Sequence, residues 1–559
     1  MDRIELLSPV GGEDSLKAAV FGGADAVYFG GSRFNARMNA KNFSSEALFR
    51  AIDFCHENGV KAYLTLNTLI YDRKLSEALL FAETCYRAGA DALILADPGL
   101  ASLIRRDFPD FELHASTQLS AHNALAGEEF RKMGFSRLVC ARELTAENIR
   151  RLCIGSPIPV EMFVHGAICA CHSGQCLMSS VIGARSGNRG ECAQPCRLPY
   201  NGSYPLSFKD LSLAGHIREI LQLGVESLKI EGRMKSPSYV YTVTRTFRTL
   251  LDEKRDATEK EMQRLASVFS RTGFTDGYFT GRIGKEMLGV RREEDKAGSE
   301  KAHVTIRNAA PEREAVLVHR EEKKASPVET LPFYPLKKEC SARFYDPASV
   351  TGAGFFDVIY LPLEAFDPAI ANGFFLPGVI TDGEIEETKK KIDRAAALGA
   401  RHALVGNFGH LALLRGKGFV LHGDFRFNVY NSYTAKVLEE LEDVILSPEL
   451  NLAQMRDLAA KKSVIVYGRV PLMLLEKRVG AASLQDRKNA VFPVLREGKR
   501  DLVLNSVPLY MGDREAELKK NRLLSRHFLF TTESKKEASA IIEAYRLGKE
   551  VRFPVRRLK

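Results

Sequence analysis

A regular alternation of short apolar runs and amphipathic helical patterns fills the first 235 residues of this 559-residue chain. Repeated β–α units of this kind predict a parallel sheet covered by helices, either closed as a barrel or open and doubly wound. Eight runs have the pattern of strands, which favours a (β/α)8 TIM-type barrel. They are Ile4–Leu7, Ala26–Phe29, Lys61–Leu66, Ala92–Leu95, Glu112–Ala115, Arg137–Cys140, Val160–Val164 and Ser227–Ile230.

Helices are expected between most of these strands, and a longer helix over Tyr239–Glu253 leads out of the unit. The predicted α/β architecture has three parts. A barrel occupies residues 1–255, and a small appended module with some β structure occupies 256–345. A second, degenerate barrel-like α/β unit occupies 346–559. The middle part contains the alternating segment Ala302–His319, which suggests β structure.

The third part carries a divergent copy of the first. ELHASTQLSAHN at 112–123 aligns with VLHGDFRFNVYN at 420–431, so that His114 falls on His422 and Asn123 on Asn431. Three further pairs of segments align in the same order, at 92–106 with 403–416, 137–152 with 443–458, and 160–168 with 464–472. This order predicts a duplicated barrel-type unit. The second copy has no cysteine after Cys340.

Charge and hydropathy limit the classes of function that the chain can have. The 80 Lys and Arg residues exceed the 70 Asp and Glu residues by 10, which is compatible with a polyanionic partner such as RNA and equally with a basic enzyme. No apolar run approaches the roughly 18 residues of a membrane helix, and no secretory signal is evident at the start. We therefore expect a cytoplasmic protein without a membrane or DNA partner, whose cysteines stay reduced.

Five of the ten cysteines lie between Glu161 and Cys196. Four of them follow the spacing Cys169-x6-Cys176-x15-Cys192-x3-Cys196, with Cys171 in addition. The stretch begins where a predicted barrel strand ends, which is where barrel enzymes carry their chemistry. Thiolates gathered in one loop suit a 4Fe–4S cluster or a structural zinc ion, and the spacing leaves both open. Buried or redox-active thiols are the third interpretation.

Other candidates stand at predicted strand ends. Lys229, Glu231, Arg233 and Lys235 alternate after the last strand, so period-2 geometry places them on one side. Such a basic group with one carboxylate suits a carboxylate or phosphate ligand, although an ion-paired strand end fits as well. The predicted catalytic residues are His165, Glu231 and Lys229, and the predicted substrate-binding residues are Arg233, Asn67, Arg142 and Lys235. His172 also flanks the first cysteine.

Hydrolase motifs are mostly missing. His56-Glu57 lacks the second histidine of HExxH, and no GxSxG sequence occurs. A cysteine nucleophile with a histidine base stays open.

The stretch Glu161-x-Phe163-x2-Gly166-Ala167-Ile168-Cys169-x4-Gly174-x-Cys176-x-Met178-Ser179 resembles the signature of the peptidase U32 family. The segments STQLSAHN, ARELT and KIEGRMKSPSYV fit that family too. The resemblance implies an oxygen-independent RNA hydroxylase that acts on tRNA or ribosomal RNA, with prephenate as the hydroxyl source. It also implies a 4Fe–4S cluster held by the cysteines that match the family's ligands, Cys169, Cys176, Cys192 and Cys196.

The same resemblance carries an alternative, since the family's name denotes proteolysis. The rival function is a collagenase-like peptidase with a structural metal, such as zinc, in the cysteine loop. A third hypothesis is a non-catalytic RNA-binding protein or assembly partner that uses the cluster only for structure. The middle of the chain also departs from the long RNA-modifying members, which carry a larger insert than residues 286–380 allow, so the particular RNA stays open.

Overall fold

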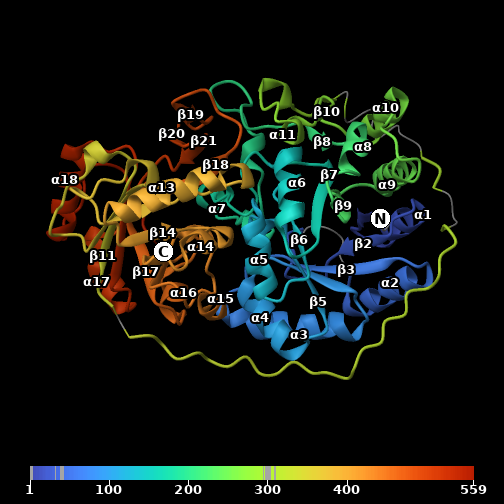
Figure 1. The fold of residues 1–559 in the computed structure, drawn as a ribbon, viewed down its shortest axis with the longest axis horizontal. Coiled ribbons are helices and arrows are strands. Elements are labelled where there is room, and N and C mark those ends of the chain that lie inside the picture. The colour runs from blue at the N-terminus through green and yellow to red at the C-terminus, as the bar shows by residue number, and fades with distance from the viewer. Residues whose placement is uncertain are drawn as a thin grey trace.

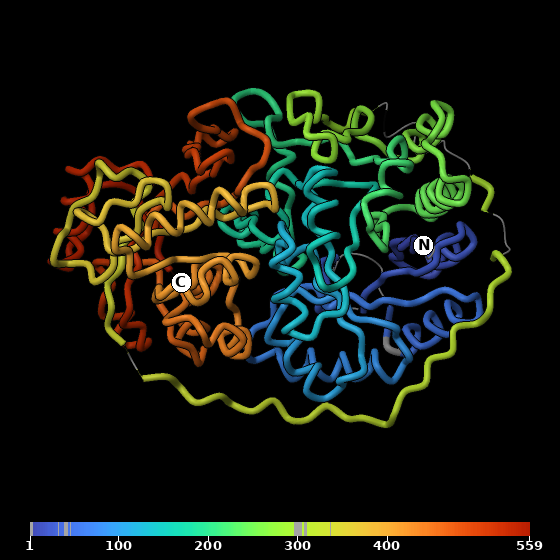
Figure 2. The backbone as a smooth tube through the Cα atoms, viewed as in Figure 1, coloured from blue at the N-terminus to red at the C-terminus, as the bar shows by residue number. Residues whose placement is uncertain are grey.

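The computed structural model describes residues 4–31, 33–37, 43–293, 295, 304–306, 310–335 and 337–558. Two barrels lie side by side, and the segment that connects them runs along the outside of the molecule (Figures 1 and 2). Among the helices of the described residues, none is both long and apolar enough to cross a membrane.

The first barrel is a closed ring of eight parallel strands. β1 pairs with β2 on one side and with β9 on the other, and a β7–β9 pairing closes the ring. All eight predicted strands are confirmed to within two residues at each end. They are β1 (Glu5–Pro9), β2 (Ala26–Phe29), β3 (Lys61–Leu66), β4 (Ala92–Leu95), β5 (Glu112–Ala115), β6 (Arg137–Val139), β7 (Val160–Gly166) and β9 (Ser227–Ile230).

Helices follow the strands and cover the barrel (Figure 1). Polar caps explain several of the starting points, because a side-chain oxygen there accepts a hydrogen bond from an otherwise unpaired backbone N–H. Asp97, Asn123 and Thr145 act in this way. The helices are α1 (Glu13–Phe21), α2 (Ser45–Glu57), α3 (Asp72–Arg87), α4 (Pro98–Asp107), α5 (Ala124–Lys132), α6 (Ala146–Gly155) and α9 (Pro237–Asp252).

The second unit, expected to be degenerate, also closes a complete ring of eight parallel strands, with β23 joining β11 and β17. Its strands are β11 (Cys340–Phe344), β12 (Val358–Pro362), β13 (Gly373–Phe375), β14 (His402–Val405), β15 (Val420–Gly423), β16 (Asp443–Ile445), β17 (Lys462–Gly468) and β23 (Ser525–Phe530). Its helices are α13 (Ile385–Ala397), α14 (Phe408–Leu414), α15 (Ser432–Val437), α16 (Leu452–Asp457), α17 (Glu515–Lys520) and α18 (Lys535–Arg546).

The duplication extends to backbone detail. Gly166 ends β7 with φ 107°, and Gly468 ends β17 with φ 140°. A side chain at either position would collide with a backbone carbonyl of the neighbouring strand, that of Glu231 or that of Leu529. From each glycine the chain makes an antiparallel pairing, to β8 (Asp210–Ser212) in the first barrel and to β22 (Leu509–Tyr510) in the second.

Most of the stretch 256–345 adds to the first barrel instead of forming a sheet of its own, but its last residues, Cys340–Phe344, form β11 of the second barrel. It contains α10 (Glu259–Val268), α11 (Gly277–Thr280) and the two-residue strand β10 (Phe274–Thr275), which pairs with β8. No strand forms in the described residues of Ala302–His319; residues 302–303 and 307–309 lie outside the described part. This connection is held by side chains, as where Arg320 donates to the carbonyl of Ala90.

An antiparallel sheet that the sequence did not reveal is inserted between β17 and β23. Its strands are β18 (Pro471–Leu475), β19 (Ser483–Gln485), β20 (Val491–Glu497) and β21 (Arg500–Leu504). The two barrels also meet through two helix pairs (Figure 1). In these pairs α4 packs against α15, and α5 packs against α14. α4 and α5 follow β4 and β5, and α14 and α15 follow β14 and β15, so corresponding helices of the two barrels form the interface.

Candidate metal-cluster site at the mouth of the first barrel

The cysteine loop leaves the first barrel where β7 ends and returns at β8. It carries one short helix, α7 (Met178–Gly183), and two 3-10 turns. Cys169 and Cys192 have exposed side chains, whereas Cys176 and Cys196 are half-buried. The loop therefore presents sulfur to the surface at the carboxyl end of the barrel, which is the edge where barrel enzymes place their chemistry.

The four spaced cysteines lie together. Burial raises the pKa of Cys196 to about 12, and the nearby thiols of Cys169, Cys176 and Cys192 raise it as well. The pKa of Cys176 is raised first by its hydrogen bond to Cys171 and then by burial. Thiolates this close repel one another, so a cation among them stabilises the deprotonated form. The donor set therefore fits a thiolate-bound metal or cluster.

The second barrel unit braces this loop through β18. The backbone N–H of Leu474 donates to Cys171 Sγ at 3.3 Å, and the N–H of His172 donates to the carbonyl of Leu474 at 2.9 Å. The backbone N–H of Leu177 likewise donates a hydrogen bond to the carbonyl of Leu472 at 2.8 Å. Cys171 is buried in this contact. Its place thus differs from that of the four clustered thiols.

A carboxylate between two arginines lies beside the cysteines. Arg37 Nη2 is 3.1 Å from Glu231 Oε1, and Arg142 Nη2 is 3.4 Å from Glu231 Oε2. Burial raises the pKa of Glu231, but Arg37 and Arg142 outweigh it and the pKa is lowered overall. Burial raises the pKa of Cys169, and the nearby charge of Arg142 opposes that rise. The Arg37–Glu231–Arg142 group and the cysteines therefore lie together at the mouth of the first barrel.

Two other predicted residues hold the segment that carries Arg37. Arg233 Nη1 donates to Asn35 Oδ1 at 3.2 Å and to Thr65 Oγ1 at 3.1 Å. Asn67 Oδ1 accepts from the backbone N–H of Ala36 at 3.0 Å. Both residues thus lie at the mouth, where they fix the loop after β2.

Lys229 lies deeper, inside the barrel. Its Nζ donates to Glu161 Oε1 at 2.7 Å and lies 4.5 Å from the ring centroid of Tyr28. Both partners are buried. Lys229 is therefore an ion-paired core residue below the Glu231 group.

The structure does not bring His165 and Lys235 into this group. His165 Nδ1 is 3.2 Å from Ser212 Oγ, and its ring packs against Tyr239 and Phe247 of α9. Burial lowers the pKa of His165 to about 3. Lys235 lies over the ring of Phe269, and burial lowers its pKa to about 7.

Sequence reasoning missed Arg37 and Arg197. Arg197 follows Cys196 and donates to the carbonyl of Ile168 at 2.9 Å, which ties the two ends of the cysteine loop together. Arg37 stands in a stretch without periodicity. Its place shortly after the end of the strand Ala26–Phe29 was the one available signal.

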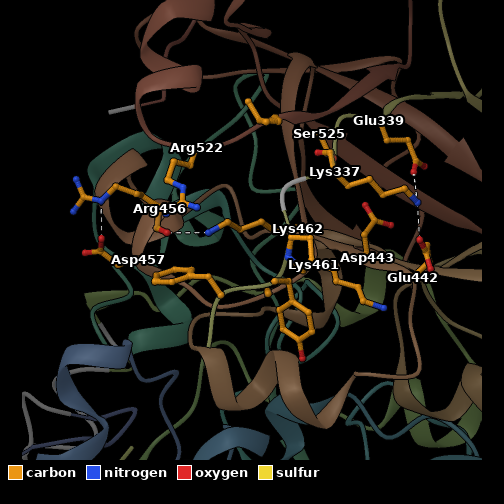
Figure 3. A pocket seen from close by; sticks show the side chains of 15 residues that line it. Lys337, Glu339, Glu442, Asp443, Arg456, Asp457, Lys461, Lys462, Arg522 and Ser525 are labelled. Carbon is orange, nitrogen blue, oxygen red and sulfur yellow. Dashed lines mark hydrogen bonds and ion pairs between the residues drawn. The ribbon is translucent and has the colours of Figure 1, made fainter. Parts of the chain in front are cut away.

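A cavity of about 480 Å³ lies elsewhere, at the amino ends of β16, β17 and β23 (Figure 3). Its charges are largely paired: Lys337 contacts Glu339 and Glu442, and Lys462 Nζ donates to backbone carbonyls at the carboxyl end of α16. Catalytic residues of TIM barrels come from the opposite edge. The cysteine mouth is therefore the stronger candidate.

Fold and site together define a duplicated TIM-barrel protein with a thiol cluster and an arginine–carboxylate group at the mouth of one barrel. The model of peptidase family U32 matches residues 11–289 and 375–481, and the chain belongs to that family.

Three relatives each match about half of this chain. The "23S rRNA 5-hydroxycytidine C2501 synthase" of Escherichia coli is 40% identical over 45% of this chain and 39% of its own length. The "tRNA hydroxylation protein P1" of Bacillus subtilis is 37% identical over 44% of this chain and 63% of its own length. The "Collagenase" of Porphyromonas gingivalis is 36% identical over 51% of this chain and 76% of its own length. The chain thus spans less than two thirds of the first two relatives.

Proposed function

We propose that this protein is an oxygen-independent RNA hydroxylase. The observation that carries the proposal is the shared barrel mouth, where the four-cysteine group adjoins the Arg37–Glu231–Arg142 group. Two relatives at 40% and 37% identity bear names of enzymes or factors in the hydroxylation of ribosomal RNA and tRNA. A site where thiols that could hold a redox cluster lie beside two arginines suits that chemistry.

The cysteines would hold a 4Fe–4S cluster through Cys169, Cys176, Cys192 and Cys196. All-thiolate ligation by four cysteines is typical of such clusters, and such a cluster supplies single-electron chemistry when bound. Arg142 and Arg197 beside the thiols would offset the negative charge of the ligands. Zinc accepts the same donors and is the rival occupant.

A small carboxylated co-substrate, proposed to be prephenate, would bind at Arg37 and Arg142. Guanidinium groups bind carboxylates in fixed planar geometry, and both arginines are already held toward the mouth by Glu231. Glu231 keeps their side chains oriented before the ligand arrives. Asn67 and Arg233 would position the Arg37 segment.

The RNA itself would be attracted by the excess of 10 positive charges, because phosphate neutralisation dominates non-specific RNA affinity. The second barrel would support catalysis indirectly by fixing the cysteine loop through β18. A substrate of this kind also implies the cytoplasm, where thiols stay reduced.

The alternative, a peptidase, is favoured by the relative named "Collagenase". The serine–histidine contact near this mouth is that of Ser212 with His165. Both side chains are buried, and His165 Nε2 has no hydrogen-bond partner within the part of the chain that the structure describes. A histidine with a pKa of about 3 is a weak base at neutral pH. The geometry therefore supports hydroxylation better than hydrolysis.

Anaerobic purification followed by assays for iron, sulfide and zinc tests the cofactor. Mass spectrometry of nucleosides from a deletion strain tests the reaction, and we expect one hydroxylated nucleoside to disappear. Wild-type protein should restore it, whereas Cys192→Ala should not. Stoichiometric zinc without sulfide, or unchanged RNA together with lost peptide cleavage, would refute the proposal.

A further inference from the structure

Two histidines and a glutamate converge on one point outside the cysteine group. They stand on three successive loops at the carboxyl edge of the first barrel: His122 between β5 and α5, Glu143 between β6 and α6, and His172 after β7. His122 Nε2 is 3.1 Å from His172 Nδ1, which is 3.6 Å from Glu143 Oε2. One ligand atom from each residue lies within 4.8 Å of the other two.

The glutamate in this group lacks a hydrogen-bond partner. Glu143 is only 4% exposed, and neither carboxylate oxygen has a partner among the described residues. At 3.6 Å, its oxygen is beyond hydrogen-bond distance of His172. A buried carboxylate left in this way is costly unless a cation or a proton satisfies it. A proton shared by the two imidazoles would still leave Glu143 unsatisfied.

The other nitrogen of His172 is held as metal-binding histidines usually are. His172 Nε2 is 3.0 Å from Glu476 Oε2, and Glu476 accepts a hydrogen bond from Arg500 Nε at 2.6 Å. A carboxylate behind a ligating histidine fixes its ring and tautomer. Glu476 directly follows β18, and Arg500 is the first residue of β21, in the inserted sheet of the second unit.

The second barrel offers an informative contrast. There His402 Nδ1 is 3.0 Å from His422 Nε2, and His422 Nδ1 is 2.6 Å from Asp443 Oδ1. Asp443 therefore contacts the far nitrogen and forms a satisfied linear chain. In the first barrel Glu476 contacts the far nitrogen of His172 in the same way, and a second carboxylate, Glu143, lies beside the nitrogen that faces the other histidine. The donors there converge on a common centre.

We propose that His122, Glu143 and His172 bind one divalent transition-metal ion of the zinc or ferrous class, separate from the cysteine site. Two imidazoles and a carboxylate are a donor set that such ions prefer. Donors about 2.0–2.2 Å from a common ion stand roughly 3–3.5 Å apart. Two of the three donor pairs are close to this, at 3.1 and 3.6 Å. Three protein ligands leave a position open for water or substrate. The ion would also tie the cysteine loop to two neighbouring barrel loops.

The test uses Zn²⁺ as the probe on the whole, anaerobically purified wild-type protein. After dialysis we expect one retained equivalent of zinc. X-ray absorption at the zinc edge does not detect iron. It should show nitrogen and oxygen atoms at about 2.0–2.1 Å from the zinc ion. His122→Ala and His172→Ala should each lower zinc affinity at least about 100-fold, and Glu476→Gln about 10- to 100-fold.

Two controls separate this site from its surroundings. His402→Gln alters the matched histidine pair of the second barrel and should leave zinc binding unchanged. Cys192→Ala should keep the zinc even though the proposed cluster is lost, so failure of one proposal is distinguishable from failure of the other. A shell of sulfur alone at about 2.3 Å around all of the retained zinc, or no zinc retained by folded wild-type protein, would overturn the inference.

Discussion

Asn123 and Asn431 occupy equivalent positions in the two barrels and make the same pair of interactions. Each side-chain oxygen caps its own helix, accepting from the N–H of Ala126 at 3.1 Å or of Thr434 at 2.7 Å. Each amide also donates to a carbonyl of the other barrel: Asn123 to Ile380 at 2.7 Å and Asn431 to Ile70 at 2.9 Å. The repeat in the sequence is therefore also a repeated contact across the interface.

Replacing one of these asparagines should weaken the interface. Asn431→Ala removes a helix cap and leaves a buried carbonyl without its donor, so we expect the free energy of unfolding to fall by about 1–3 kcal/mol. Urea denaturation measures the change. Asn451→Ala, which removes only the exposed cap of α16, should cost less. Equal losses would mean that the bond between barrels contributes nothing.

Substitutions should distinguish the proposed cluster ligands from Cys171, which has a structural contact with Leu474. Cys176→Ala should lower bound iron and sulfide, because it removes one of the four proposed thiolate ligands. Cys171→Ala should keep both, since that sulfur bonds Leu474 and Cys176 and costs only about 1 kcal/mol when lost. Cys153→Ala, half-buried in α6, is the control. Loss of iron from Cys171→Ala alone would contradict the assignment.

Arg142 should determine the affinity for the co-substrate. Arg142→Gln removes a charged donor worth about 1.5–3 kcal/mol, so we expect the KM for the carboxylated co-substrate to rise about 10- to 100-fold while iron content stays constant. Arg150→Gln, which changes an exposed arginine of α6 paired with Glu147, serves as the control. An unchanged KM in Arg142→Gln would show that the anion binds elsewhere.

His165 should make the protein sensitive to acid. Burial lowers the pKa of His165 from 6.5 to about 3, so between these values the unfolded chain binds a proton that the folded protein excludes. Stability from this residue is complete above pH 6.5 and falls by up to about 1.4 kcal/mol per pH unit below it. His165→Phe fits the aromatic surroundings and should flatten unfolding free energy against pH.

Ser212→Ala is the matched variant for this measurement. It removes the hydrogen-bond partner of His165 but keeps the titrating ring, so its pH slope should equal that of the wild type. Parallel curves for His165→Phe and wild type would show that another group causes the acid sensitivity. Lost hydroxylation in a stable His165→Phe would favour a direct role for His165.

Much of the fold was predictable because it depends on local patterns. The eight strands of the first barrel follow apolar runs with helical segments between them, and the period of each run selects strand or helix wherever the chain is buried. Lys229 lies in β9 and Glu231 directly after it, but the alternation expected over 229–235 is wrong, because β9 ends at Ile230 and the chain turns at Arg233 and Met234. Period-2 geometry gives the side of a strand and says nothing about what fills the barrel below it.

The sequence alone determined the β–α alternation, the duplication that aligns Asn123 with Asn431, and the one loop rich in cysteine. These are patterns of neighbouring residues, which propensity and periodicity encode directly. Tertiary structure decided that Cys171 rests on Leu474 and that Glu231 lies between Arg37 and Arg142. It also brought His122, Glu143 and His172 together. Closing a barrel joins residues tens to hundreds of positions apart, and no local pattern records that distance.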